Sequence, residues 1–221
     1  MDELLTTEAK RRVLTDEAAN MLTHALGLML SIAATTVLVL VARERGDAWQ
    51  IVGCSVFGAA LIALYAASTL SHAFQQPRLR HFFRTVDQVC IFLLIAGTYT
   101  PFALAFLRGG WWWALLAAIW GLALLGIIFK VFVRGHQNVA TWSYVALGWL
   151  PIIAVRPIVA RVPGTALAWL LAGGIFYTIG TLFLARDERY PYFHAIWHLF
   201  VIGGSACHYI GVLLYVLPWP K

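Results

Sequence analysis

The chain has 221 residues, of which 61% are hydrophobic and only 12% are charged, and its formal net charge is +6. An ordinary soluble domain carries roughly 25% charged residues, and a disordered chain has low hydrophobicity, so the composition excludes both classes. It predicts an integral membrane protein. The positive charge then reports how the chain is oriented in the membrane, and it gives no reason to expect nucleic acid as a partner.

A membrane-spanning helix needs about 20 consecutive, mainly apolar residues. Seven of the stretches between consecutive Asp, Glu, Lys or Arg residues are long enough, namely 18–42, 48–77, 88–107, 109–129, 135–155, 162–185 and 190–220. This pattern predicts an all-α, multi-pass protein of the cell (inner or plasma) membrane with seven transmembrane helices. We expect residues 1–16 to form an N-terminal cytoplasmic tail and residues 17–221 to form the seven-helix transmembrane domain.

The distribution of Lys and Arg residues predicts the orientation of these spans. Seven spans place the two termini on opposite sides of the membrane. With the N-terminus in the cytoplasm, ten of the 16 Lys and Arg residues lie on the cytoplasmic side and six lie outside. Positive residues in short loops favour the cytoplasmic side, so we expect a cytoplasmic N-terminus and a C-terminus outside.

The first span opens with three polar side chains on one helix face. Glu17, Asn20 and His24 follow one another at positions i, i+3 and i+7, a spacing that places them on the same side of a helix. One interpretation is a helix cap with a packed polar face. The other is a network that supports a metal site by holding its ligands in position.

The second and third spans add a hydroxyl, an imidazole and a carboxylate. Ser68 and His72 lie four residues apart near the end of the second span, and Asp87 immediately precedes the third. One interpretation of Asp87 is a first-turn acid favoured by the helix dipole, or a partner for Arg84 three residues earlier. The other is a group that binds a catalytic water, acts as its general base or orients a ligating histidine. Ser68 would steady that water or stabilise developing oxyanion charge.

The seventh span opens with two histidines. His194 and His198 lie at positions i and i+4, so they share a helix face and can bind one ion. With a cytoplasmic N-terminus, both lie near the same membrane face as His72. Three imidazoles with an open fourth position are the ligand set of a catalytic zinc site. His208 lies about 15 Å further along the helix and is interpreted as structural or as lining a substrate cavity.

Three motifs carry a resemblance to a known family, and together they extend from residue 17 to residue 208. They are E-x-x-N-x-x-T-H, S-x-x-x-H followed by an Asp, and H-x-x-x-H followed by a further His. The chain resembles bacterial hemolysin III proteins within the progestin and adipoQ receptor (PAQR) superfamily. The resemblance implies seven helices with the N-terminus inside, a zinc ion held by His72, His194 and His198, and Asp87 and Ser68 near the zinc-bound water. Related receptors and alkaline ceramidases resemble lipid amidases.

Three functions remain open from the sequence. The first is a zinc-dependent hydrolase of a lipid amide or ester at the cytoplasmic side, in which Asp87 takes up the proton and Ser68 assists. The second is a non-enzymatic membrane regulator or receptor-like protein with a structural zinc ion and a lipid ligand. The third is a pore-forming hemolysin, which we rank lower because the spans lack the lines of charge that mark a wide ion pathway.

Overall fold

The computed structural model describes residues 2–108, 112–132 and 137–217. All regular secondary structure in this part of the chain is helical, which confirms the all-α prediction. The elements are α1 (Asp2–Arg45), α2 (Ala48–Ala73), α3 (Pro77–Phe106), α4 (Trp112–Phe132), α5 (Gln137–Trp149), the 3-10 helix η1 (Leu150–Ala154), α6 (Val155–Val159), α7 (Gly164–Leu184), α8 (Phe193–Gly211) and the π-helix η2 (Val212–Val216).

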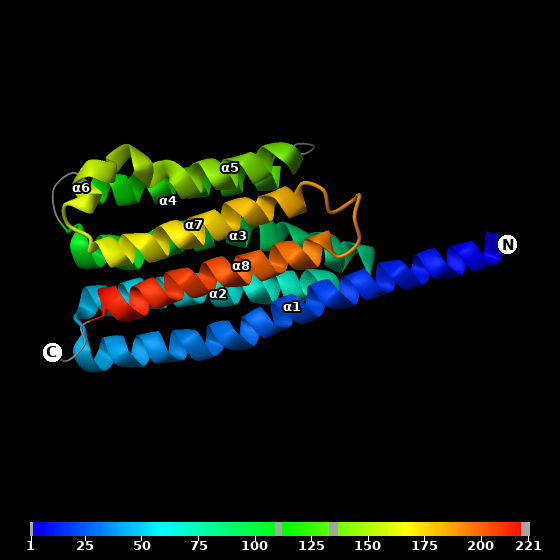
Figure 1. Ribbon diagram of the computed structural model, residues 1–221, viewed down its shortest axis with the longest axis horizontal. Helices are drawn as coiled ribbons and strands as arrows, with labels where there is room; N and C mark the ends of the chain where they lie inside the picture. The colour runs from blue at the N-terminus through cyan, green and yellow to red at the C-terminus, as the bar shows by residue number, and fades with distance from the viewer. Residues whose placement is uncertain (1, 109–111, 133–136, 218–221) are drawn as a thin grey trace.

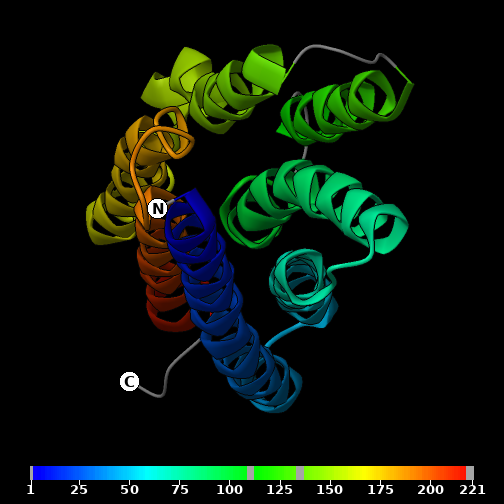
Figure 2. The same cartoon turned by 90° about the vertical axis from the view of Figure 1, so that its right-hand side faces the viewer.

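The long helices lie side by side, and α1 extends beyond the others at one end (Figure 1). Seen along their axes, they form a ring in the order α1, α2, α3, α4, α5, α7 and α8 (Figure 2). Contact between α8 and α1 closes the ring. The first and last helices of the chain therefore meet, so residues near either end of the sequence can contribute to one site.

Six described segments are long and apolar enough to cross a membrane. They are Leu14–Arg45, Ala48–Ala73, Pro77–Phe106, Trp113–Phe132, Gly164–Leu184 and Phe193–Val216. The expected fifth span, 135–155, instead contains the shorter apolar segment Thr141–Ala154. Its α-helix ends at Trp149, and Pro151 lies in the first turn of η1, since proline cannot donate the backbone hydrogen bond that would continue the α-helix.

Two helices, α1 and α3, begin well before the charge-free stretches that they contain. The third helix begins at Pro77 rather than at residue 88, so Asp87 lies inside α3 and not before it. The described part of the expected tail, residues 2–16, is helical and continuous with the first span. Charged residues end the apolar stretch without ending the helix, because their side chains remain compatible with helical backbone outside the hydrocarbon layer.

The core lies where α1, α2 and α3 pack against α8, and it buries Cys54, Phe57, Leu61 and Tyr65 of α2 almost completely. The outward faces are apolar too. On α4, for example, Leu124, Leu125 and Ile128 are 51–61% exposed. A soluble protein rarely exposes so large an apolar surface. Lipid is the environment that matches such a surface, and this agrees with a multi-pass membrane protein.

Candidate metal centre

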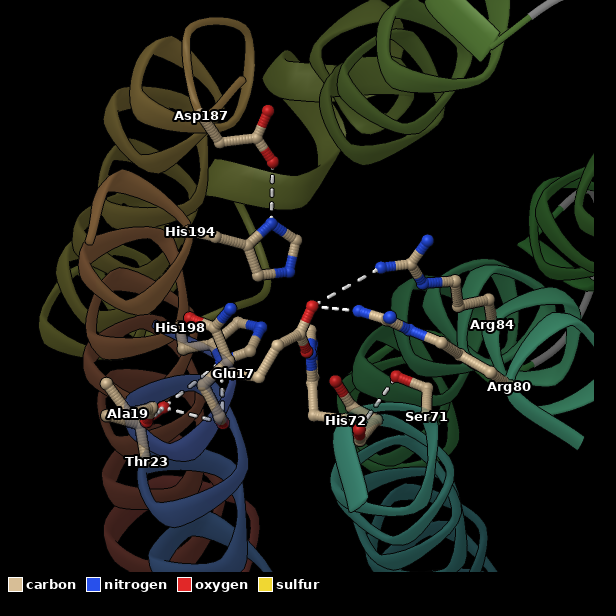
Figure 3. A network of polar contacts seen from close by, with 12 residues as sticks. Glu17, Ala19, Thr23, Ser71, His72, Arg80, Arg84, Asp187, His194 and His198 are labelled. Carbon is tan, nitrogen blue, oxygen red and sulfur yellow. Dashed lines mark hydrogen bonds and ion pairs between the residues drawn. The ribbon is translucent and has the colours of Figure 1, made fainter. Parts of the chain in front are cut away.

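Three histidines from two helices converge at one end of the ring. His72 lies on the last turns of α2, and His194 and His198 lie on the first turns of α8. One ligand nitrogen from each can be chosen so that all three lie within 4.8 Å of one another. His72 and His198 are buried, and His194 is half-buried. Figure 3 shows the three imidazoles facing a common space.

Two of the three rings are oriented by carboxylates. Nδ1–H of His72 donates to Oε2 of Glu17 at 2.7 Å, and Nδ1–H of His194 donates to Oδ2 of Asp187 at 2.6 Å (Figure 3). An ionised carboxylate only accepts hydrogen bonds, so the proton of each neutral ring is assigned to Nδ1. The Nε2 lone pair of each ring is therefore available to a metal ion.

The third ring is oriented by the backbone of α1. Nδ1 of His198 lies 3.1 Å from the carbonyl oxygen of Asn20 and 3.1 Å from Oγ1 of Thr23. The hydroxyl of Thr23 is also placed to donate to the carbonyls of Ala19 and Asn20, at 2.9 Å each. His198 is consequently the donor to these oxygens, which again assigns the proton to Nδ1 and the lone pair to Nε2.

This arrangement fits zinc. A histidine that binds a metal almost always donates its other N–H to a carboxylate or a backbone carbonyl, and all three rings do so. Three protein ligands with one open position are typical of catalytic rather than structural zinc. Among the described residues, the group of candidate ligands contains the three histidines and no carboxylate.

Glu17 connects three helices at the site. Besides accepting the bond from His72, it forms an ion pair with Arg80 of α3, and Arg84 lies 3.8 Å from its Oε1 (Figure 3). Its side chain is only 14% exposed. One carboxylate thus holds the ring of His72 while it joins α1 to α2 and α3.

The other site residues expected from the sequence lie around this centre. Ser68 and Asp87 line the same cavity as the three histidines. Ser68 is fully buried, and its side chain interacts with the carboxyl group of Asp87. The ring of His24 stacks on that of His198 with centroids 3.5 Å apart. Asn20 contributes its backbone carbonyl, while its side-chain oxygen has no partner in the described part of the chain.

The cavity leads from the histidines into the interior of the ring. Its volume is about 2800 Å³, and most of its lining is apolar. It reaches Phe102 and Leu107 at the far end of α3, and it is bordered by residues of α4, α5 and α7. A long apolar chain can therefore occupy it with one end beside the histidines.

Sequence reasoning missed Asp187, which lies in the loop between α7 and α8. The signal available was an acidic residue seven positions before His194, on the side of the membrane expected for the metal site. The loop ends at Tyr192, whose φ of 62° is left-handed, a strained conformation for a bulky residue. This reversal of the backbone turns the chain from the loop that carries Asp187 into the helix that carries His194.

Comparisons with known proteins show which proteins the chain resembles over nearly its whole length. The family described as "Haemolysin-III related" matches residues 12–209. Hemolysin-3 of Bacillus cereus is 47% identical over 204 residues, which cover 92% of this chain and 93% of that protein. The hemolysin-3 homolog of Bacillus subtilis (strain 168) is 42% identical over 206 residues, covering 93% and 96%. Human monocyte to macrophage differentiation factor is 29% identical over 215 residues, covering 93% and 86%.

Proposed function

The chain belongs to the haemolysin-III-related family of multi-pass membrane proteins, within the PAQR superfamily, and we propose that it is a zinc-dependent hydrolase of a lipid amide or ester. The observation that carries the proposal is the shared orientation of three imidazoles, each of which donates through Nδ1 and directs Nε2 to one space. A structural zinc site would be closed by a fourth protein ligand. The open position favours catalysis.

The residues around the centre support hydrolysis. A bound zinc ion supplies Lewis-acid chemistry and lowers the pKa of a water to about 7. Asp87 takes the proton released when the water oxygen attacks the carbonyl carbon, and it returns this proton to the amine or alkoxide that leaves. The hydroxyl of Ser68 donates a hydrogen bond to the carbonyl oxygen as negative charge develops on it. The apolar cavity holds the lipid chain while water enters from the cytoplasmic side.

The proposed orientation follows from the distribution of charge. The 13-residue α5 continues directly into the five-residue η1, and together they form the remaining span of a seven-span protein. The N-terminus is cytoplasmic and the C-terminus lies outside, because ten of the 16 positive residues then lie on the cytoplasmic side. The metal centre accordingly faces the cytoplasm.

Turnover of a lipid panel by the zinc-loaded protein tests the hydrolase. The panel contains amides and esters of fatty acids, and released fatty acid is measured by mass spectrometry. We expect Asp87→Asn to lose at least about a hundredfold in rate while its zinc content is unchanged. Glu188→Gln is the control, because Glu188 is an exposed acid that borders the same cavity. Equal rates for Asp87→Asn and wild type would refute the role of Asp87, and no turnover at all would favour a structural zinc.

A second candidate, membrane lysis, is favoured by the names of the two Bacillus relatives, hemolysin-3 and a hemolysin-3 homolog. Release of a trapped dye from phospholipid vesicles separates it from hydrolysis. Lysis that persists after a chelator has removed the zinc would assign pore formation to the helix bundle itself. Lysis that disappears with the zinc would instead follow from cleavage of the vesicle lipids.

A further inference from the structure

The cavity is lined by a histidine, far from the metal centre, that the proposed chemistry does not use. His208 lines the cavity and is 6% exposed. It lies ten residues after His198 on α8, so it is about 15 Å deeper in the molecule. It therefore lies too deep to contact the group that reacts at the metal centre.

The hydrogen bonds of His208 determine which of its nitrogens can accept. Nε2 lies 3.2 Å from the carbonyl oxygen of Leu170. A carbonyl oxygen only accepts, so Nε2 carries the proton and Nδ1 carries the lone pair. Nδ1 is buried and has no partner among the described residues. A buried acceptor without a donor destabilises the folded protein, and a donor from a ligand would remove this penalty.

The packing around His208 holds its ring in this orientation. A Cβ on Gly173 would lie 2.3 Å from Nε2 of His208, so the ring lies directly against the backbone of α7. Tyr177 packs edge-on against it, with ring centroids 5.4 Å apart.

The hydroxyl groups near His208 are hydrogen-bonded to one another, because Oγ of Ser205 lies 2.9 Å from the hydroxyl oxygens of both Tyr65 and Tyr177. Nδ1 is therefore an unpaired acceptor on a ring that lines the cavity together with Leu167, Leu170 and Val201.

We propose that Nδ1 of His208 is a second recognition point, which accepts a hydrogen bond from a hydroxyl carried partway along the acyl chain of the ligand. The inference rests on the proposed function for the position of the head group beside the three histidines. An extended chain advances about 1.2 Å per bond, so a depth of about 15 Å corresponds to about twelve bonds. An unsubstituted chain fills the same space and leaves Nδ1 unpaired.

The affinities of three fatty acids test this recognition point. The probes are stearic acid, 12-hydroxystearic acid and 2-hydroxystearic acid, titrated into zinc-loaded protein in detergent by isothermal calorimetry. One added hydrogen bond to a buried acceptor corresponds to about tenfold in Kd. We expect the 12-hydroxy acid to bind about tenfold more tightly than the other two acids. We expect His208→Phe, which keeps an aromatic ring and removes the acceptor, to bind the 12-hydroxy acid and stearic acid equally.

The controls separate this recognition point from the metal centre. Tyr209→Phe removes a hydroxyl from the adjacent position of α8 and should keep the tenfold preference. Equal affinities in zinc-loaded wild type would overturn the inference and leave the hydrolase proposal intact, as would a preference that survives in His208→Phe. Failure of every acid to bind would contradict both. If His208→Phe does not fold, the affinities of the 2-hydroxy and 12-hydroxy acids for wild type still test the inference, because only the 12-hydroxy acid places its hydroxyl at the depth of His208. Equal affinities of these two acids would overturn it.

Discussion

Asp187 orients His194 from a loop, whereas Glu17 and the carbonyl of Asn20 orient the other two rings from a helix. Each acceptor fixes the tautomer of the imidazole that it holds and restricts the rotation of the ring. His194 is also the most exposed of the three rings. Its orientation therefore depends most on a single contact, the one to Oδ2 of Asp187.

We predict that Asp187→Asn weakens zinc binding about 10- to 100-fold, the usual effect of removing such a partner. The amide keeps the size of the side chain but replaces the negative charge that supports His194. Competition with a chromogenic chelator measures the change in Kd. Glu188→Gln removes an equal charge one residue further along the same loop, with its side chain exposed, and should leave the Kd unchanged. Equal losses in both variants would show that only the charge of the loop matters.

Among the helices, α2 and α3, which carry His72 and Asp87, approach each other closely at a glycine. A Cβ on Gly53 would lie 2.7 Å from the Cα of Pro101. A backbone atom cannot move aside as the end of a side chain can. The two helices are therefore held at a separation that only glycine permits at this position.

We predict that Gly53→Ala lowers the free energy of unfolding by about 1–3 kcal/mol, the usual effect of overpacking. Gly121→Ala in α4 is the matched control, because its Cβ would meet nothing within 4 Å. That variant should be neutral or gain up to about 1 kcal/mol from helix propensity. Thermal unfolding in detergent, followed by circular dichroism, compares the two variants. Equal stability of both would contradict the close approach of α2 to α3.

The N-terminus of α2 predicts a dependence on pH. Asp47 accepts a hydrogen bond from the backbone N–H of Gln50 at 2.9 Å and lies 2.5 Å from Nη2 of Arg108. The bond from Gln50, supported by Arg108, lowers the pKa of Asp47. A carboxyl group whose pKa is lower in the folded state than in the unfolded state stabilises the folded protein. This stabilisation is fully present above the unfolded-state pKa, which is about 4 for Asp. It is lost as the pH falls through the folded-state pKa.

We therefore expect wild type to be more stable than Asp47→Asn at neutral pH and the difference to shrink below about pH 4. The amide oxygen of Asn preserves the helix cap, so the comparison isolates the charge. Melting temperatures of both proteins between about pH 7 and pH 3 measure how the difference in stability changes with pH. A difference that stays constant across this range would show that the charge of Asp47 contributes nothing to stability.

The fold of the whole molecule and the position of its candidate metal centre were partly predictable from the sequence. His72 and His198 lie 126 positions apart in the sequence, yet counting apolar stretches places both near one membrane face, and the structure brings them together. The pairing of His194 with Asp187 was not predictable, because it depends on how a loop reverses before α8. The position of Asp87 inside α3 was missed for a different reason, since charged residues bound an apolar stretch without ending the helix. The roles of Asp87 and Ser68 in catalysis remain predictions.

The proposed orientation of the whole chain predicts which loops are accessible from outside the cell. A membrane-impermeant maleimide should label Glu44→Cys in intact cells, because the α1–α2 connection lies outside when the N-terminus is cytoplasmic. It should label Glu188→Cys only after lysis. Both side chains are exposed, and the native Cys54, Cys90 and Cys207 are buried. Labelling of Glu188→Cys in intact cells would reverse the orientation.

Metal content is the measurement that tests the central claim, a zinc ion held by three histidines from α2 and α8. Inductively coupled plasma mass spectrometry would be applied to detergent-purified wild type, His72→Ala, His194→Ala, His198→Ala and the exposed control His81→Ala. We predict near-stoichiometric zinc in wild type and in His81→Ala, and its loss in the other three variants. Folded wild type without metal, or zinc retained after all three substitutions, would contradict the account.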